Sequence, residues 1–138
     1  MANTMELEIN GTVYAFKAGF AFIREVDPLH KQKRNGIEEN VGLNVLLGGL
    51  LDKNADDLLT ALIAMNKGQE QRVTKKELEE YIEEHDDIES LYGQVIDFLS
   101  NANCTKAKML QLTELYQEMQ KKQRADLLGH GANSTSNV

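Results

Sequence analysis

The sequence predicts a mostly helical α+β protein, in which an N-terminal two-stranded β-hairpin packs on a domain of five or six helices. Three observations lead to this fold class. Alternating apolar and polar residues flank an Asn-Gly pair near the N-terminus, apolar residues recur at helical spacing along most of the remaining chain, and the 138 residues include a single proline. A chain of this length fits one domain, which we place at residues 1–128.

The N-terminal hairpin is predicted at residues 5–9 and 12–17. Met5, Leu7 and Ile9 alternate with glutamates, Asn10-Gly11 follows, and a second alternating run comes next. An Asn-Gly pair between two such runs is a strong hairpin signal, because both central residues of a type I′ turn need positive φ. Two strands alone are only marginally stable in water, so this hairpin must pack on helices or pair with another chain.

The helices are predicted from apolar spacing and from capping residues. Asn54, Thr74 and Thr105 are expected to be N-caps, and Thr74 with Glu77 has the spacing of a capping box. The apolar seam continues through His85 without a break, so one long helix is possible there, although two are favoured. The predicted helices span residues 19–26, 41–51, 55–66, 74–84, 86–99 and from 105 onward.

Two intervening segments and the C-terminus complete the prediction. Residues 31–36 are interpreted as a solvated connector, and the helix at 41–51 as a buried centre that is apolar on nearly all sides. Gly48-Gly49 in that helix indicates either close helix packing or a bend. Residues 129–138 contain few apolar side chains and are predicted to form a disordered tail.

The composition disfavours several classes of partner. The net charge of −7 repels phosphate backbones and anionic membrane surfaces, so we expect no nucleic-acid partner and no membrane partner. The first ten residues lack the apolar run of a signal peptide, and no stretch approaches the roughly 20 apolar residues of a membrane span. Cys104 is the only cysteine, which excludes an intramolecular disulfide and suits a reducing cytoplasm.

The search for chemical motifs gives no catalytic, cofactor or metal site. Asp52, Asn54 and Asp56 have the spacing that opens a calcium loop, but the loop's required Gly and final Glu are replaced by Asp57 and Ile63. The three histidines share no metal-binding spacing, and His85 is interpreted as a half-buried histidine of the core. We therefore expect a protein that binds other proteins, is not an enzyme and needs no cofactor.

The N-terminal segments carry a resemblance to a known family. Residues 5–17 read MELEINGTVYAFK and residues 19–26 read GFAFIREV. This resembles the tail assembly chaperones of long-tailed bacteriophages of Gram-positive hosts, which begin with an LEINGK-Y-F hairpin that runs into GFGFLREI. The resemblance continues in order to about residue 100, through residues 78–84, which read LEEYIEE.

The resemblance implies a mechanism without chemistry. Such chaperones act in the host cytoplasm during tail morphogenesis and are absent from the finished virion. They coat the long tape measure protein, keep it soluble, and help tail tube subunits polymerise around it. The implied partners are therefore the tape measure protein and the tail tube protein. Self-association is a further expectation, and no catalytic residue is carried over.

Two surfaces have apolar residues beyond what one small domain needs. One is the open strand edge of the N-terminal hairpin. The other is a seam on the helix predicted from residue 105 onward, formed by Met109, Leu112, Tyr116 and Met119. Methionine suits a surface that must fit many sequences, because its side chain is flexible and polarisable. Two interpretations stay open, since the same seam would also serve to close the core.

Other functions remain as alternatives. One alternative is a structural tail or head-completion protein that stays in the particle. A small helical phage regulatory protein is a further alternative, but it would need a basic recognition face, and the basic clusters are confined to residues 31–34 and 121–124. An enzyme is the least favoured class.

Overall fold

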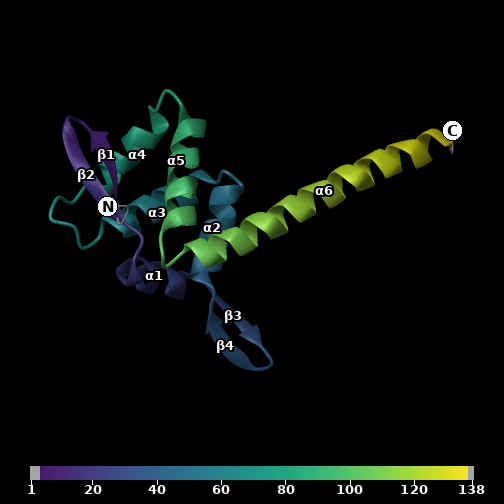
Figure 1. Cartoon of the computed structure of the whole chain (residues 1–138), viewed down its shortest axis with the longest axis horizontal. Coiled ribbons are helices and arrows are strands. Elements are labelled where there is room, and N and C mark those ends of the chain that lie inside the picture. The colour runs from purple at the N-terminus through teal and green to yellow at the C-terminus, as the bar shows by residue number, and fades with distance from the viewer. Residues whose placement is uncertain (1–3, 137–138) are drawn as a thin grey trace.

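The computed structural model describes residues 4–136, with side chains described from residue 4 to residue 128 (Figure 1). The fold class is confirmed, since helices make up 62% of the structure and strands form only two small hairpins. The elements in chain order are β1 (Thr4–Ile9), β2 (Thr12–Lys17), α1 (Phe20–Val26), a 3-10 turn (Asp27–Leu29), β3 (Lys31–Arg34), β4 (Ile37–Asn40), α2 (Gly42–Leu51), α3 (Ala55–Asn66), α4 (Lys75–Glu83), α5 (Ile88–Asn101) and α6 (Lys106–Ser136).

The N-terminal hairpin forms as predicted. β1 and β2 pair antiparallel in a register that places Met5 opposite Phe16 and Leu7 opposite Tyr14. Asn10 and Gly11 both have positive φ, as a type I′ turn requires. One face of the hairpin is buried against the helices, with β2 on α3 and β1 on α4, whereas Val13 lies on the exposed face. The buried face is formed by Met5, Leu7, Ile9, Tyr14 and Phe16.

A second hairpin replaces the predicted connector at residues 31–36. β3 and β4 pair antiparallel around Asn35-Gly36, whose φ angles are again positive. The hairpin projects from the body, by which we mean the packed part of the fold formed by β1, β2, α1 to α5 and the first turns of α6 (Figure 1). The prediction was wrong because these strands lack apolar alternation. Their cross-strand pairs are charged, such as Lys33 opposite Glu38, and nearly all of their residues are exposed. Sheet formation here depends on the turn and the backbone, and no apolar face contributes.

The centre of the body is the packing of α2 against α3. Leu58, Leu62 and Met65 of α3 are completely buried, and α3 touches α1, α2, α4 and β2. By contrast, α2 is not buried on all sides as predicted, because Asn44 and Val45 face solvent. Its buried side carries the core residues Leu43, Leu46, Leu47 and Leu50.

The close packing predicted for Gly48-Gly49 is confirmed at Gly49 only. A Cβ at Gly49 would lie 1.8 Å from a carboxylate oxygen of Asp57 on α3, whereas a Cβ at Gly48 would meet nothing within 4 Å. The carboxylate of Asp57 therefore occupies the space where a side chain at Gly49 would be. Burial in this position raises the pKa of Asp57 above the usual aspartate value.

Asn66, the last residue of α3, is the one fully buried amide in the described part of the core. Its Nδ2 donates to the carbonyls of Ala15 and Gln71, both at 3.0 Å, and its Oδ1 accepts from the N–H of Val73 at 2.9 Å. One side chain thus joins β2 to the loop between α3 and α4. A buried amide is stable only when its groups are paired in this way.

Two separate helices, α4 and α5, lie on either side of His85, as the sequence favours. α4 begins with the predicted capping box, in which Thr74 and Glu77 satisfy each other's backbone N–H groups. α5 restarts with Asp87, whose carboxylate accepts from the N–H of Ser90 at 3.2 Å. The change of direction between the helices keeps both apolar faces on the body.

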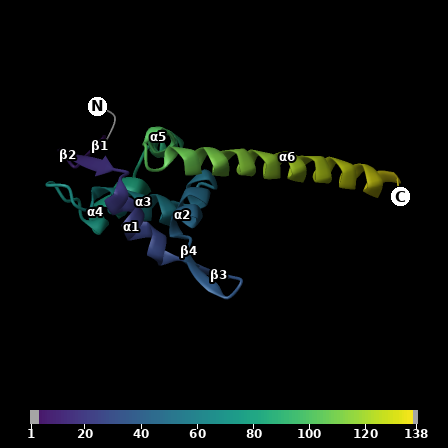
Figure 2. The same ribbon diagram turned by 60° about the horizontal axis from the view of Figure 1, so that its bottom comes forward.

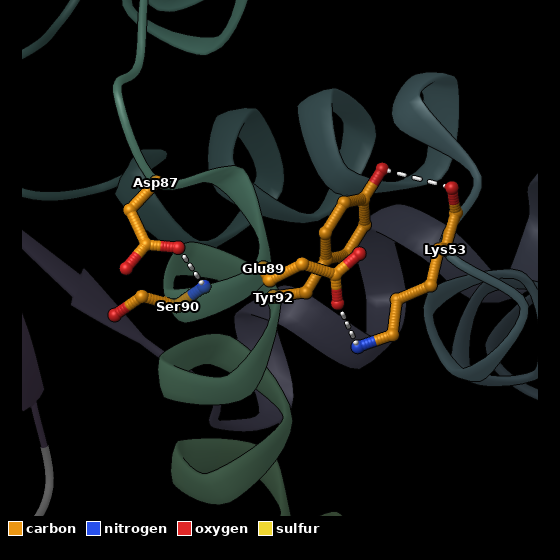
Figure 3. Close-up of polar contacts among 5 residues, drawn as sticks. All are labelled: Lys53, Asp87, Glu89, Ser90 and Tyr92. Carbon is orange, nitrogen blue, oxygen red and sulfur yellow. Dashed lines mark hydrogen bonds and ion pairs between the residues drawn. The ribbon is translucent and has the colours of Figure 1, made fainter.

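Figure 3 shows how α5 is fixed to the link between α2 and α3. The hydroxyl of Tyr92 donates to the carbonyl of Lys53 at 3.0 Å, and Lys53 Nζ lies 3.3 Å from a carboxylate oxygen of Glu89. The same ammonium lies 5.3 Å from the centre of the Tyr92 ring. Lys53 has a φ of 60°, so these contacts hold the link in a left-handed turn.

α6 packs on α2 and α5 with its first turns and then runs away from the body as a long single helix (Figures 1 and 2). Its backbone is helical to Ser136, whereas the sequence predicts a disordered tail over residues 129–138. The side chains of residues 129–138 lie outside the described residues. The disordered tail therefore stays a prediction.

Candidate partner-binding surface

The start of α6 is fixed to the end of α5 by a buried threonine. Thr105 has no exposed surface, and its hydroxyl donates to the carbonyl of Leu99 at 2.6 Å. The sequence predicts Thr105 as an N-cap, but this hydroxyl acts as a donor to α5 and does not accept from the N–H groups of α6. The bond sets the position from which α6 leaves the body.

The seam predicted at Met109, Leu112, Tyr116 and Met119 lies on α6, and we call it the α6 seam; it divides into a buried and an exposed half. Met109 is completely buried and Leu112 is half-buried against the core, whereas 57% of Met119 is exposed. Tyr116 lies between them and its hydroxyl accepts from the side-chain amide of Gln120 at 3.1 Å. From Gln117 to Leu128 every residue is exposed. Both interpretations of the seam therefore apply, to different parts of it.

Two exposed leucines near the seam were not among the predicted site residues. Leu115 is 55% exposed and lies three residues after Leu112 and four before Met119, which places it on the same face. This helical spacing was the signal available in the sequence. Leu110 is 61% exposed on another face, where it borders a hollow of about 470 Å³ with Ser100, Lys106, Ala107 and Thr113.

The N-terminal hairpin offers backbone groups and not apolar side chains. In the described part of the chain β1 pairs only with β2, so one edge of each strand is unpaired. The large apolar side chains of both strands are buried within the body, except Val13 of β2, which is 51% exposed. Pairing with another chain at this edge would therefore depend on main-chain hydrogen bonds.

An acidic hollow of about 380 Å³ lies between the tip of this hairpin and the turn from α4 to α5. His85 is half-buried there, with Nδ1 accepting from the N–H of Asp87 at 3.0 Å and its ring edge-on to Tyr81 at 5.2 Å. Burial raises the pKa of Tyr81. The remaining lining residues are Ile9, Asn10, Glu77, Glu80, Glu84 and Asp86.

Asn54, from the segment whose spacing resembles the start of a calcium loop, has a structural role in the fold. Asn54 accepts from the N–H of Asp57 at 3.1 Å and so caps α3, as predicted. Cys104 is a free, half-buried cysteine. Within the described residues, no three His, Cys, Asp or Glu side chains are grouped so as to hold a metal ion.

A comparison with protein families decides what this helical body is. The model of the family "Phage tail assembly chaperone protein, TAC" matches residues 6–114, which is well over half of the chain. The chain belongs to this family of phage tail assembly chaperones. No curated protein and no solved structure matched it.

The family match covers the N-terminal hairpin and the buried half of the α6 seam, but not the exposed half. The matched segment begins in β1 and ends at Glu114, where α6 leaves the body, so Met109 and Leu112 lie inside it. Tyr116 and Met119 lie beyond its end.

Across the described part of the chaperone, no helix has both the length and the apolar character needed to cross a membrane.

Proposed function

We propose that this chaperone binds the tape measure protein and recruits tail tube subunits to it in the host cytoplasm. On this proposal it works by binding alone, with no enzymatic activity, and leaves before the virion is complete. The family membership supports a role in tail assembly. The observation that supports binding of the tape measure protein is the exposed half of the α6 seam.

This half of the seam suits a long helical partner. Leu115, Tyr116 and Met119 form an apolar stripe on a helix that continues away from the body, flanked by Gln and Glu. An amphipathic helix of a partner can lie along such a stripe, with apolar side chains at i, i+3 and i+4 as anchors. Met119, at its outer end, has a flexible and polarisable side chain that can adapt to different partner sequences.

The experiment is co-expression of the chaperone with the tape measure protein of the same phage, followed by affinity purification and sedimentation of insoluble material. Tyr116→Asp with Met119→Asp should weaken tape measure binding strongly and leave the body folded. A matched control, Gln117→Asp with Ala125→Asp, adds the same two charges to exposed positions on the other side of the helix and should bind normally. Normal binding by the seam variant would place the surface elsewhere.

The chaperone role also needs to be separated from a structural tail or head-completion protein. Mass spectrometry of purified virions should find the tail tube protein and no stoichiometric amount of this chain. A fixed number of copies in each particle would support the structural alternative. A tail tube gene upstream of the coding sequence and a very long tape measure gene downstream would support the proposal.

A further inference from the structure

The apolar stripe on α6 continues beyond Met119 after one polar turn. Each residue of an α-helix advances by about 100° round the axis, so Gln123 and Leu127 follow Met119 on the same side, successively further out. Every side chain from Gln117 to Leu128 is exposed, and the exposed fraction of Leu127 is 73%. The outer part of α6 therefore presents an apolar level at Met119, a polar level at Gln123 and a second apolar level at Leu127.

The two neighbours of Gln123 are basic and lie on opposite sides of the stripe. The centre of the stripe lies midway between the directions of Tyr116 and Met119. From this centre, Lys122 lies about 90° to one side and Arg124 about 110° to the other. Among the described residues no ion pair involves a side chain of α6, so both cations are available to a partner. We call Lys122, Gln123 and Arg124 the basic turn of α6.

The acidic side chains of this part of α6 lie on its far side or further out along the helix. Glu114 and Glu118 lie more than about 120° from the centre of the stripe. Asp126 lies on the same side of the stripe as Lys122, four residues later. A carboxylate of a partner helix is therefore attracted at the basic turn and repelled by Asp126 one level further out.

We infer that this stripe selects a helix of the tape measure protein in which an acidic residue lies between two apolar residues, one helical turn from each. The apolar pair packs at Met119 and Leu127. The carboxylate lies at the basic turn, where Lys122 and Arg124 attract it and the amide of Gln123 donates to it. The inference rests on the proposed function and adds the chemistry of the helix that the stripe accepts.

The polar level inside an apolar stripe is the reason for an acidic residue at this position of the partner. An apolar side chain opposite Gln123 would remove water from its amide without replacing the hydrogen bonds, which is unfavourable. A carboxylate replaces them and is attracted by two cations as well. A single polar position within an apolar helix contact also fixes the register of the two helices, as it does in coiled coils.

The same features favour a protein helix over nucleic acid. Nucleic acids bind through many cations on one face, whereas this stripe has one cation on each side and apolar levels at both ends. The whole chain carries a net charge of −7, and Asp126 lies beside the basic turn. Burial of Met119 and Leu127 requires apolar side chains opposite them, and an amphipathic helix supplies these.

The first test titrates the purified full chain with overlapping peptides that together cover the tape measure protein of the same phage. Peptides that bind should contain the apolar–acidic–apolar pattern, and changing the acidic residue to lysine should weaken their binding. Binding that is confined to peptides without the pattern overturns the inference and leaves the proposed function standing. If neither the peptides nor the co-expressed tape measure protein binds, both are overturned.

Neighbouring lysines provide a matched pair of variants. Lys122→Glu reverses a charge beside the stripe and should weaken binding of the tape measure protein by at least about fivefold. Lys121→Glu changes the net charge equally but lies about 170° from the centre of the stripe, so it should leave the dissociation constant within about twofold. Circular dichroism checks that the helix content of both variants is unchanged. Equal effects of the two variants, or no effect of Lys122→Glu, overturn the inference even if binding still depends on Tyr116 and Met119.

An exchange of charges tests the contact directly. Lys122→Glu with Arg124→Glu should lose affinity for a binding peptide and recover it when the acidic residue of the peptide is changed to lysine. Failure to recover overturns the inference. A fluorescent single-stranded RNA serves as the competing probe, and it should not bind. RNA binding that Lys122→Glu abolishes while the tape measure protein still binds normally would assign the basic turn to nucleic acid and overturn the inference.

Discussion

At the scale of single residues, Asn66 holds together parts of the chain that are far apart in the sequence. Asn66→Ala leaves the carbonyls of Ala15 and Gln71 and the N–H of Val73 without their partner. We expect a loss of about 2–4 kcal/mol in the free energy of unfolding, measured by urea denaturation. Asn101→Ala, on the exposed side of α5, should change it by less than about 0.5 kcal/mol. Equal effects would show that the buried network contributes little.

Two glycines of α2 should respond in opposite directions to the same substitution. A Cβ at Gly42 would lie 1.8 Å from the carbonyl oxygen of Val26, and backbone cannot move aside, so Gly42→Ala should cost about 1–3 kcal/mol. Gly48 has open space, so Gly48→Ala should stabilise by up to about 1 kcal/mol through helix propensity. Thermal melts of the two variants test the pair. Destabilisation by Gly48→Ala would contradict the helix-propensity argument.

Single-residue contacts of this kind were only partly predictable. The caps Asn54 and Thr74 could be identified, because a cap bonds to residues two or three positions away and its signal is local. The role of Asn66 could not, since Ala15 lies 51 residues away in the sequence. Gly49 and Gly48 look alike in sequence, and only the position of α3 distinguishes them.

At the scale of elements, the capping box of α4 should make stability depend on pH. The backbone N–H and hydroxyl of Thr74 donate to Glu77 and hold its pKa below the usual glutamate value. A lowered pKa in the folded state stabilises above the unfolded pKa, and this contribution disappears as the pH falls through the folded pKa. Glu77→Gln keeps the shape and removes the charge.

The free energy of unfolding of Glu77→Gln should therefore lie below that of the wild type at pH 7 and approach it toward pH 3. Urea denaturation at a series of pH values measures the difference. Glu79→Gln, an exposed residue of the same helix, serves as the control for a general charge effect. A wild-type advantage that stays constant down to pH 3 would contradict the role of the carboxylate.

The two hairpins should differ in how readily they open. β1 and β2 bury an apolar face in the core, whereas β3 and β4 have exposed charged residues and one exposed ion pair, between Lys31 and Glu38. Surface ion pairs contribute little and two strands alone are marginal. Amide hydrogen exchange should therefore be fast in β3 and β4 and slow in β1 and β2. Equal protection would imply a contact of β3 and β4 with another chain.

The same difference explains which elements the sequence could predict. β1, α4 and α5 have a periodic apolar face, and this periodicity is visible in the sequence. β3 and β4 have none, so only Asn35-Gly36 signalled their turn. The exposure of Asn44 and Val45 was missed because an apolar composition does not show which side of α2 has no neighbour.

At the scale of the whole molecule, the body should be stable without the C-terminal residues. Deleting residues 130–138 should leave the free energy of unfolding within about 0.5 kcal/mol, because the described part of α6 is already clear of the body well before this point. Denaturant melts of the shortened and full chains make the comparison. A larger loss would mean that the tail contacts the body or a second copy.

The candidate site could be located from the sequence only in part. The spacing of Met109, Leu112, Tyr116 and Met119 marks one face of a helix, and the structure places all four on that face. Spacing does not reveal where the neighbouring helices end. The transition from buried Met109 to exposed Met119 follows from the lengths of α2 and α5, which pack beside α6 and stop short of its outer part.

The bond from Asn66 to Ala15 also has a consequence for the order of events during synthesis. The N-terminal hairpin is translated before α3 and α4, which cover its apolar face and follow tens of residues later. At roughly 5–20 residues per second, the 51 residues from Ala15 to Asn66 take on the order of 3–10 s to be added. Throughout this interval the apolar face of the nascent hairpin is exposed to solvent. The assembly chaperone therefore itself passes through a stage in which an apolar segment lacks the helices that later cover it.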